Sequence, residues 1–362
     1  MGHDRNGRCL YNDPMHRHKS LILPLFICLL CTATVITLSA PFSAQQAAAH
    51  HVNENNYWNV TGTQPANIEH HEITSSYLNS GANLVGINVY TPPGYEATGN
   101  TTRYPVIYML HGLSGNERNF FNQYSSLQAL YTEMSPFSLI EGTVNTSLDM
   151  PEAIVVLVNG GSQSFYNDYD DEFHGPNSPF PIMTESIIMN EVIPYVDAHY
   201  RTIASRAGRA IEGFSMGGRG ALKLAFKNAD QFCSVVAYAG AAYESIPVTQ
   251  SPYFGPFPEA ERISFITADN AAAIRNNDLQ IRLVIGTNDA DRGNSDLSAQ
   301  LTALGINHEY LPNLAGVGHN WHDYYVNNGD VGLNFHQQCF TSDVTPPPPP
   351  NYDYFTFLPI AM

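Results

Sequence analysis

Short apolar runs alternate along the chain with segments of helical periodicity. The apolar runs are rich in β-branched side chains and bounded by turn residues, which is typical of buried strands. Strands that alternate with helices favour an α/β fold, with a mostly parallel central sheet and helices on both faces. The predicted strands are 104–110, 209–214, 279–287 and 308–311, and the predicted helices are 217–226 and 296–304.

One predicted junction between a strand and a helix carries a motif of catalytic type. Residues 213–218 read Gly-Phe-Ser-Met-Gly-Gly, which fits the Gly-x-Ser-x-Gly pattern of a nucleophile elbow. In such an elbow the turn is so sharp that only small flanking residues avoid a clash. Ser215 is therefore the predicted nucleophile, and the amide of Met216 is predicted to face a developing oxyanion. The motif alone also fits a glycine-rich turn with an idle serine.

Two later strand ends supply the residues that would complete a triad. Asp289 follows the strand predicted at 279–287, and His319 lies on a glycine-flanked loop after the strand at 308–311. The order serine, aspartate, histidine is that of the α/β-hydrolases. We expect His319 to take the Ser215 proton and return it to the leaving group, while Asp289 holds the tautomer of the ring. Asp291 is expected to face solvent or to cap the turn.

The strand predicted at 104–110 is followed at once by His111-Gly112-Leu113. This has the shape of the His-Gly loop that supplies a second oxyanion donor, here the N–H of Leu113. His111 precedes the serine and so stands in the wrong chain order for the general base. We therefore interpret His111 as structural.

With these four elements in place, the chain resembles the esterase D-like branch of the α/β-hydrolases. That branch includes S-formylglutathione hydrolases, bacterial feruloyl esterases and secreted mycolyltransferases. The resemblance covers about residues 68–340 and implies an α/β-hydrolase fold and a serine esterase or acyltransferase, with Ser215, Asp289 and His319 on the catalytic positions. Asn159 departs from the aspartate of many relatives but lies off the triad. Further similar segments are Val89–Tyr95, Ala153–Gly161, Ser164–Asn167 and Ile193–Arg201.

Residues 1–49 are predicted to form an N-terminal leader. A basic segment precedes the apolar stretch 21–40, as in a secretory signal peptide. The stretch is also almost long enough for an uncleaved membrane anchor, which is the alternative. The small residues Ala47–Ala49 favour cleavage, so that the secreted protein would begin near His50. Either way the catalytic domain is predicted to be secreted or extracytoplasmic at the cell surface.

The rest of the chain is predicted to hold one esterase domain at 50–340, a proline-rich linker at 341–351 and a short aromatic and apolar tail at 352–362. The tail is too short to cross a membrane, and either a docking role or clipping during export fits it. After the leader only Cys233 and Cys339 remain. A disulfide and two buried thiols are equally consistent with them.

Charge limits the partners. The chain carries a net charge of −17, and removal of the leader leaves 12 basic and 31 acidic residues, a net charge of −19. This argues against nucleic acid, anionic glycans and acidic membrane surfaces. No metal and no cofactor are predicted, because the acidic segments 168–172 and 289–296 lack the ligand spacing of a calcium loop. The expected partner is a small-molecule or polysaccharide-linked ester, with membrane contact only through an uncleaved leader.

Aromatic residues near the predicted site indicate the substrate. Tyr253 and Phe254 lie in the segment 243–277 that leads to the acid strand, and Trp321 follows His319 closely. An aromatic rim suits an apolar or aromatic acyl group, so we expect uncharged esters with short, medium or hydroxycinnamoyl acyl groups. One alternative is an extracellular acyltransferase of the mycolyltransferase type with the same triad. Another is a non-catalytic surface-binding module, against which the intact triad argues.

Overall fold

The computed structural model describes residues 58–59, 68–78, 83–119, 152–161, 163–169, 182–244 and 257–340. Internal contacts divide the chain into Met1–Ser43 and Ala44–Met362, and every described residue belongs to the second unit. The predicted leader, linker and tail lie outside the described residues, and so do Tyr253 and Phe254.

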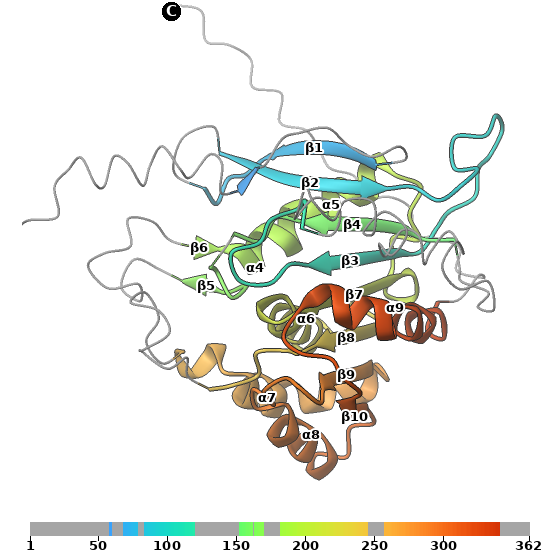
Figure 1. Cartoon of the computed structure of the whole chain (residues 1–362). Helices are drawn as coiled ribbons and strands as arrows, with labels where there is room; N and C mark the ends of the chain where they lie inside the picture. Colours follow the sequence, from blue (N-terminus) through green and yellow to red (C-terminus); the bar gives the residue numbers. More distant parts are fainter. Residues whose placement is uncertain are drawn as a thin grey trace, which may run out of the picture. The chain divides into compact units, whose positions relative to one another are not determined.

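An eight-stranded sheet forms the centre of the second unit, in the order β1-β2-β4-β3-β7-β8-β9-β10 (Figure 1). β2 pairs antiparallel with β1 and β4, and all the other neighbours are parallel. The prediction of an α/β fold with a mostly parallel sheet is confirmed. The strands are β1 (Ile68–Thr74), β2 (Leu84–Tyr90), β3 (Val106–Leu110), β4 (Ile154–Val158), β7 (Arg209–Phe214), β8 (Ser234–Tyr238), β9 (Gln280–Gly286) and β10 (Glu309–Leu314), and β5 (Asp168–Tyr169) pairs separately with β6 (Ile182–Met183).

The central strands are buried on both faces, which explains their continuous apolar sequences. Because alternate residues of a strand point to opposite faces, the core forms two clusters. In β3, Val106, Tyr108 and Leu110 belong to one cluster, and Ile107 and Met109 belong to the other. Each face of the sheet therefore needs its own cover of helices.

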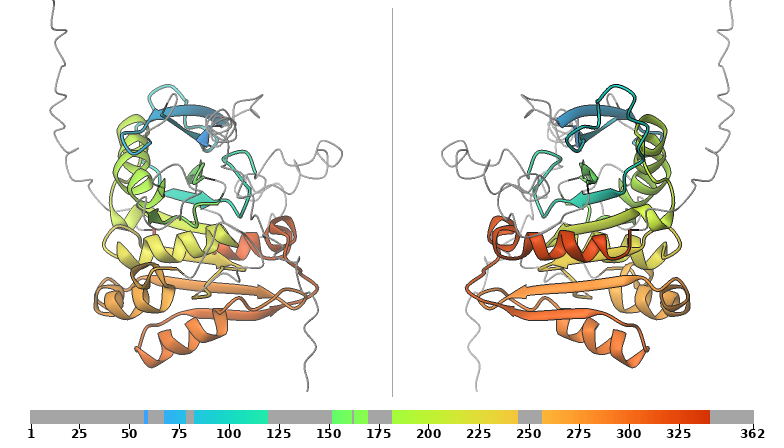
Figure 2. Two further views of the ribbon diagram at one scale, coloured as in Figure 1. Left: turned by 90° about the vertical axis from the view of Figure 1, so that its left-hand side faces the viewer. Right: turned by 90° about the vertical axis from the view of Figure 1, so that its right-hand side faces the viewer.

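Helices cover both faces, as predicted (Figure 2). Residues of α4 to α8 pack into the first cluster, and α9 packs into the second. The segment 193–201, which resembles relatives, is helical as far as His199. A π-helical segment comes before it, just ahead of Pro194, which has no N–H to donate. The helices are α4 (Thr184–Ile187), the π-helix η2 (Ile188–Val192), α5 (Ile193–His199), α6 (Met216–Lys227), α7 (Ile263–Asn276), α8 (Asn294–Ala303) and α9 (Trp321–Gln337), with 3₁₀ turns η3 (Arg206–Gly208) and η4 (Glu259–Glu261).

Cys233 and Cys339 form a disulfide, with their Cα atoms 5.7 Å apart. Of the two states that the sequence left open, the structure has the bridged one. The bond joins the start of β8 to the end of α9, so it lies at the amino ends of the parallel strands. Ser215 follows the carboxyl end of β7, at the opposite edge of the sheet. Within the described part of the chain, no helix combines the length and apolarity needed to cross a bilayer.

Candidate active site

Ser215 lies at the sharp turn between β7 and α6. Its backbone angles are φ 56° and ψ −114°, a conformation that L-residues seldom adopt. The flanking glycines make the turn possible, because a Cβ on Gly213 would collide with the backbone of Gly217, and one on Gly217 with the carbonyl of Leu110. Ser215 keeps 9% of its surface exposed. The local geometry is that of a nucleophile elbow.

The structure brings Ser215, His319 and Asp289 together although the chain separates them widely. Ser215 Oγ lies 2.9 Å from His319 Nε2, and His319 Nδ1 lies 2.8 Å from Asp289 Oδ2. A carboxylate only accepts, so Nδ1 carries the proton and Nε2 offers its lone pair to the Ser215 hydroxyl. This is the arrangement in which a histidine can act as a general base toward serine.

Asp289 is held by donors on both carboxylate oxygens. Oδ2 also accepts from the Tyr324 hydroxyl at 2.9 Å, while Oδ1 accepts from the Ala290 N–H at 2.7 Å and from Arg292 Nη2 at 3.1 Å. Burial opposes ionisation of this side chain, which is only 1% exposed. The hydrogen bonds from His319 and Tyr324 and the charge of Arg292 outweigh that effect and hold the pKa of Asp289 below its ordinary value. Asp289 therefore stays a carboxylate.

The pKa of His319 is lowered, chiefly by burial. The hydrogen bond that His319 donates to Asp289 raises this pKa, and the nearby Arg292 charge lowers it. The Phe214 ring lies 4.7 Å from the imidazole and forms part of this cover. At neutral pH the ring is therefore mainly uncharged, which is the form that can take a proton.

Asp291 has a different environment from Asp289. Its carboxylate accepts from the Gly293 N–H at 3.1 Å, from the Ser295 N–H at 3.1 Å and from the Tyr310 hydroxyl at 2.9 Å. It therefore satisfies amide groups at the start of α8, which lack acceptors within the helix. Of the two acids, Asp289 is the one that meets His319.

The loop after β3 lies beside the elbow, because β3 and β7 pair with Leu110 opposite Gly213. A Cβ on Gly112 would stand 3.2 Å from the Phe214 ring, so the loop approaches closely. Met216 begins α6, and a first-turn amide has no acceptor within its own helix. The assignment of Leu113 and Met216 as oxyanion donors stays a prediction.

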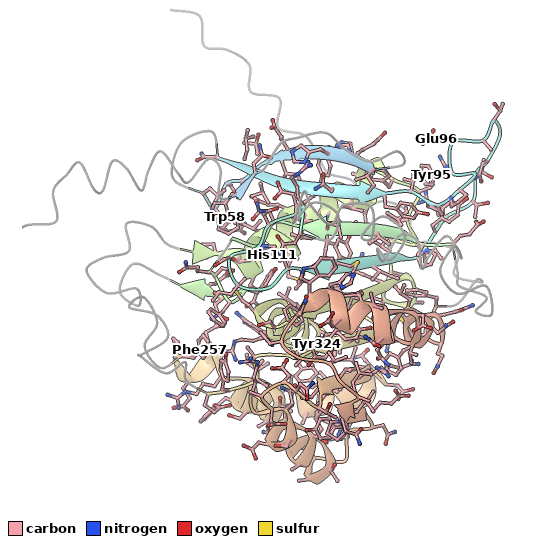
Figure 3. The ribbon with its side chains drawn as sticks, in the orientation of Figure 1. Trp58, Tyr95, Glu96, His111, Phe257 and Tyr324 are labelled. Atoms are coloured by element: carbon pink, nitrogen blue, oxygen red, sulfur yellow. A yellow bond between two sulfur atoms is a disulfide. The ribbon has the colours of Figure 1, made fainter. Side chains whose placement is uncertain are left out.

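His111 begins this loop directly after β3 and is buried (Figure 3). The Gly160 N–H donates to its Nε2 at 3.0 Å, so the proton sits on Nδ1, which donates to the Gly112 carbonyl at 2.8 Å. Burial lowers the pKa of His111 to about 4, and the ring therefore stays neutral. The Gly112 carbonyl also accepts from the Gly115 N–H at 3.0 Å. Because the N–H of a trans peptide points away from its carbonyl, these bonds fix the direction of the Leu113 N–H.

The predicted aromatic rim is described only in part. Trp321 begins α9 and is partly exposed, with its ring edge-on to Tyr325 at a centroid distance of 6.2 Å. Phe257, from the segment that also holds Tyr253 and Phe254, is buried beneath the Arg219 guanidinium, which lies 3.8 Å from its ring. Phe257 therefore packs in the core. Of the residues predicted to form the rim, Trp321 lies in the described part of the chain, whereas Tyr253 and Phe254 lie outside it.

A second set of serine, histidine and carboxylate is fully buried. Ser234 Oγ lies 2.6 Å from His336 Nδ1, and His336 Nε2 lies 3.3 Å from Glu212 Oε2. The Tyr325 hydroxyl donates to Glu212 Oε1 at 2.9 Å. All of these residues are fully buried, so a substrate cannot reach them. The set joins β7, β8 and α9 and is structural.

Sequence reasoning missed Arg292 and Tyr324, which contact the candidate acid. Neither belongs to a motif, and Tyr324 reaches Asp289 only because α9 crosses the second face of the sheet. The sequence held only a weak indication of these contacts: Arg292 lies three residues after Asp289, and Tyr324 lies five residues after His319. Among the described residues, no group of three or more His, Cys, Asp or Glu side chains is arranged to hold a metal.

Comparisons with known proteins agree with the fold. The family model named Esterase, described as "Putative esterase", matches residues 79–343. Two curated Mycobacterium tuberculosis proteins, Esterase MT1326 of strain CDC 1551 and Esterase Rv1288 of strain H37Rv, are each 32% identical over 157 residues, which is 43% of this chain and 29% of each relative. The chain thus spans under a third of the length of these relatives.

Solved structures that share the fold include the following two. A ferulic acid esterase aligns with 23% identity and a TM-score of 0.57 over 75% of this chain and 98% of its own. An S-formylglutathione hydrolase from Agrobacterium tumefaciens aligns with 18% identity and a TM-score of 0.58 over 78% of this chain and 100% of its own.

Proposed function

The chain belongs to the esterase family, and from this premise we propose that it is a serine esterase with Ser215 as nucleophile, His319 as general base and Asp289 as the residue that orients the histidine. One observation carries the proposal. Contacts of 2.9 Å and 2.8 Å run from Ser215 Oγ through His319 to Asp289, and all three residues follow the carboxyl ends of parallel strands. Sites in parallel sheets are built at that edge.

The reaction proceeds through an acyl-enzyme. Ser215 Oγ attacks the ester carbonyl carbon as its proton passes to His319 Nε2, which gives a tetrahedral intermediate with a negative oxygen. When the intermediate collapses, the alcohol leaves with the proton from His319 and the acyl group stays on Ser215. Water then attacks the acyl carbon and gives a proton to His319. The second collapse releases the carboxylic acid and returns the proton to Ser215.

The negative oxygen of each intermediate accepts hydrogen bonds from the N–H groups of Met216 and Leu113. Support comes from the position of Met216 at the start of α6 and from the bonds of Gly112 that direct the Leu113 N–H. One such donor contributes about 10²–10³ in kcat, because it stabilises charge that develops only in the transition state.

The substrates of this site are uncharged esters with short, medium or hydroxycinnamoyl acyl groups. A net charge of −17 disfavours an acid group close to the scissile bond. Trp321 near His319 offers an aromatic surface for the acyl group, and the fold is shared with a protein named ferulic acid esterase. Transfer to an alcohol in place of water, as in an acyltransferase, is the other outcome that the same triad permits.

The enzyme acts outside the cytoplasm, after export through the leader 1–49. The disulfide between Cys233 and Cys339 supports this location, since such bonds persist mainly in oxidising compartments. Sequencing of the N-terminus of the exported protein tests it. A start near His50 is expected, and recovery of the stretch 21–40 in membrane-bound enzyme would favour the anchor instead.

The Ser215→Ala substitution tests the proposed chemistry. Loss of the nucleophile should lower kcat for ester hydrolysis by roughly a thousandfold or more and abolish labelling by a fluorophosphonate probe. Ser298→Ala is a matched control, because Ser298 Oγ also contacts a histidine, His308 Nε2 at 2.7 Å, with no part in the proposed site. A folded Ser215→Ala protein that keeps a tenth of wild-type activity would exclude the assignment.

A panel of acetyl, butyryl, octanoyl, palmitoyl and feruloyl esters tests the substrate range. Acetyl to octanoyl or feruloyl esters should give the highest kcat/KM. A palmitoyl optimum would contradict the expected pocket. Assays with an added alcohol acceptor distinguish hydrolysis from transfer, and dominant transfer at modest alcohol concentration would show an acyltransferase.

A further inference from the structure

Tyr166 contacts the backbone of the loop His111–Leu113 that follows β3, which we call the oxyanion loop. Its hydroxyl donates to the carbonyl oxygen of His111 at 3.1 Å. Burial raises the pKa of Tyr166 well above its ordinary value, so the hydroxyl keeps its proton. The His111 carbonyl belongs to the peptide that precedes Gly112, and a planar peptide turns as one unit. Tyr166 therefore fixes the entry of the chain into the loop that carries the Leu113 N–H.

The Tyr166 ring has space for only one position. It is fully buried, and a Cβ on Gly160 or on Gly220 would collide with it. One of these glycines follows β4 and the other lies in α6. The Tyr166 ring is therefore packed between the segment after β4 and α6, the helix that begins after Ser215.

The backbone at Tyr166 is strained. Phe165 and Tyr166 have φ angles of 51° and 58°, a region that residues other than glycine seldom adopt. Two consecutive residues of this kind persist only where neighbouring contacts hold them. Two such contacts are present: the Tyr166 N–H donates to Ser164 Oγ at 3.0 Å, and Lys223 Nζ donates to the Tyr166 carbonyl at 3.1 Å.

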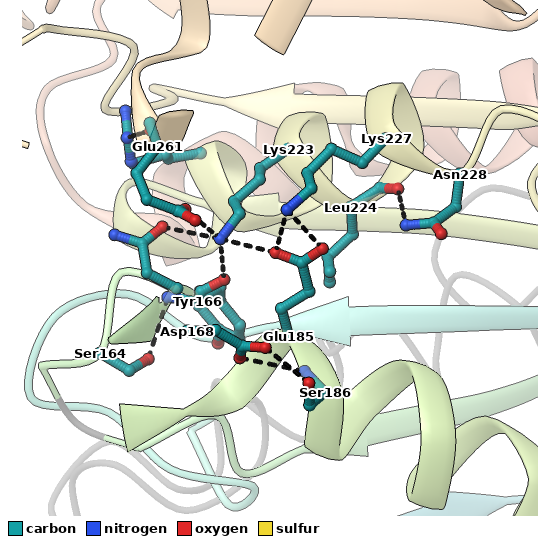
Figure 4. Close-up of polar contacts among 12 residues, drawn as sticks. Ser164, Tyr166, Asp168, Glu185, Ser186, Lys223, Leu224, Lys227, Asn228 and Glu261 are labelled. Atoms are coloured by element: carbon teal, nitrogen blue, oxygen red, sulfur yellow. Dashed lines mark hydrogen bonds and ion pairs between the residues drawn. The ribbon is translucent and has the colours of Figure 1, made fainter. Parts of the chain in front are cut away.

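Lys223 is the centre of a buried ionic cluster (Figure 4). Its Nζ lies 2.8 Å from Glu185 Oε2, pairs also with Glu261, and donates to Asn167 Oδ1 at 3.0 Å. The Lys223 side chain has no solvent exposure, and both carboxylates are largely buried. Buried charges are held strongly in place, because separating them would leave an unpaired charge away from water.

We propose that Tyr166 is a positioning residue of the oxyanion loop and that Lys223 anchors it. The inference rests on the proposed function of Ser215 and Leu113. Ser215 and Lys223 stand at the start and in the body of the same helix, α6. The helix that presents the nucleophile thus also fixes the strained turn at Tyr166, which in turn holds the loop that receives the oxyanion.

The Tyr166→Phe substitution tests the proposal. It removes the hydroxyl and keeps the ring, so kcat should fall by about tenfold while KM changes by less than about twofold. The inhibition constant of a trifluoromethyl ketone, whose adduct with serine carries an oxyanion, should rise by the same factor. A residue with a purely structural role would not shift both values together at constant KM.

Tyr95→Phe is the matched control. The Tyr95 hydroxyl accepts from the Arg201 N–H at 2.8 Å, and the residue lies at the other end of the sheet from His111 (Figure 3). Its loss should cost similar stability and leave kcat and the inhibition constant within twofold of wild type. Equal kcat in Tyr166→Phe and Tyr95→Phe would overturn the proposal.

A double-mutant cycle tests the anchor. Lys223→Met should lower kcat in the wild-type background and have a smaller effect in the Tyr166→Phe background, where the hydroxyl contact is already absent. Additive effects would remove Lys223 from the proposal, and if Lys223→Met does not fold, Glu261→Gln replaces it in the cycle. Fluorophosphonate labelling separates the two proposals: failure to label wild-type Ser215 would refute the serine esterase, whereas normal labelling with unchanged kcat in Tyr166→Phe would refute only this inference.

Discussion

The Asp289→Asn substitution tests the acid of the candidate triad, because an amide cannot satisfy the donors that surround Asp289. Oδ1 faces the Ala290 N–H and the Arg292 guanidinium, which cannot accept. The amide NH₂ group of asparagine is therefore driven to the Oδ2 side, toward His319 Nδ1. There His319 can accept only by moving its proton from Nδ1 to Nε2. In that tautomer Nε2 has no lone pair with which to take the Ser215 proton.

The size of the effect follows from this change of tautomer. Loss of the correct tautomer in a serine triad costs about 10⁴-fold in kcat, which corresponds to about 5.5 kcal/mol. Here we expect kcat to fall by roughly 10³- to 10⁴-fold, because in a fraction of the molecules His319 can keep its proton on Nδ1. Folding should be largely preserved, since the side chains have nearly the same volume.

Hydrolysis of an activated acetyl ester across the pH range is the assay, and Asp291→Asn is the control. The carboxylate of Asp291 accepts from two backbone N–H groups at the start of α8, so this variant should lose roughly 1–3 kcal/mol of stability. It should keep kcat within twofold, because the carboxylate that meets His319 is that of Asp289. The reasoning fails if Asp291→Asn is the severely impaired variant, or if Asp289→Asn keeps more than a tenth of wild-type kcat.

Three further predictions concern the surroundings of the site. Reduction of the Cys233–Cys339 disulfide, whose residues are 106 apart in sequence, should lower the free energy of unfolding by about 2–5 kcal/mol in urea, and a change below about 0.5 kcal/mol would contradict this. Arg292→Gln should raise the pKa of His319, because the guanidinium charge lowers it, so the acid limb of kcat/KM should move to higher pH; an unmoved limb would refute that role. Burial lowers the pKa of His111 from 6.5 to about 4, so the unfolded state binds a proton more readily than the folded state. The free energy of unfolding should therefore fall by about 3 kcal/mol as the pH drops from 6.5 through about 4. His111→Gln should flatten that dependence in urea unfolding.

The fold and the candidate residues of the triad could be predicted because their signals are local. The short, β-branched and turn-bounded run of β9 indicates a strand by its own sequence, and the elbow at Ser215 needs its glycines next to it in sequence. The ends of the elements were less certain: the strand predicted at 308–311 extends to Leu314, with an irregular register after Leu311. Such details depend on the pairing partner.

The residues that the sequence did not predict act across long distances in the chain. Tyr166 meets His111, and Lys223 pairs with Glu185 and Glu261, through contacts between elements that only the folded chain brings together. No spacing along the sequence reports them. Glu212 was visible as a charge inside an apolar strand, but its partners on α9 were not.

The position of α9 at the end of the folded domain determines when catalysis can begin. A chain is synthesised from its N-terminus, so the elbow at Ser215 is made before His319 and α9. Until α9 docks, the Glu212 carboxylate lacks its tyrosine and histidine partners, and Asp289 lacks the hydroxyl of Tyr324. On the proposed assignment a partly synthesised chain carries a nucleophile without its base. Under that assignment hydrolysis at Ser215 begins only after His319 has been added and α9 has docked.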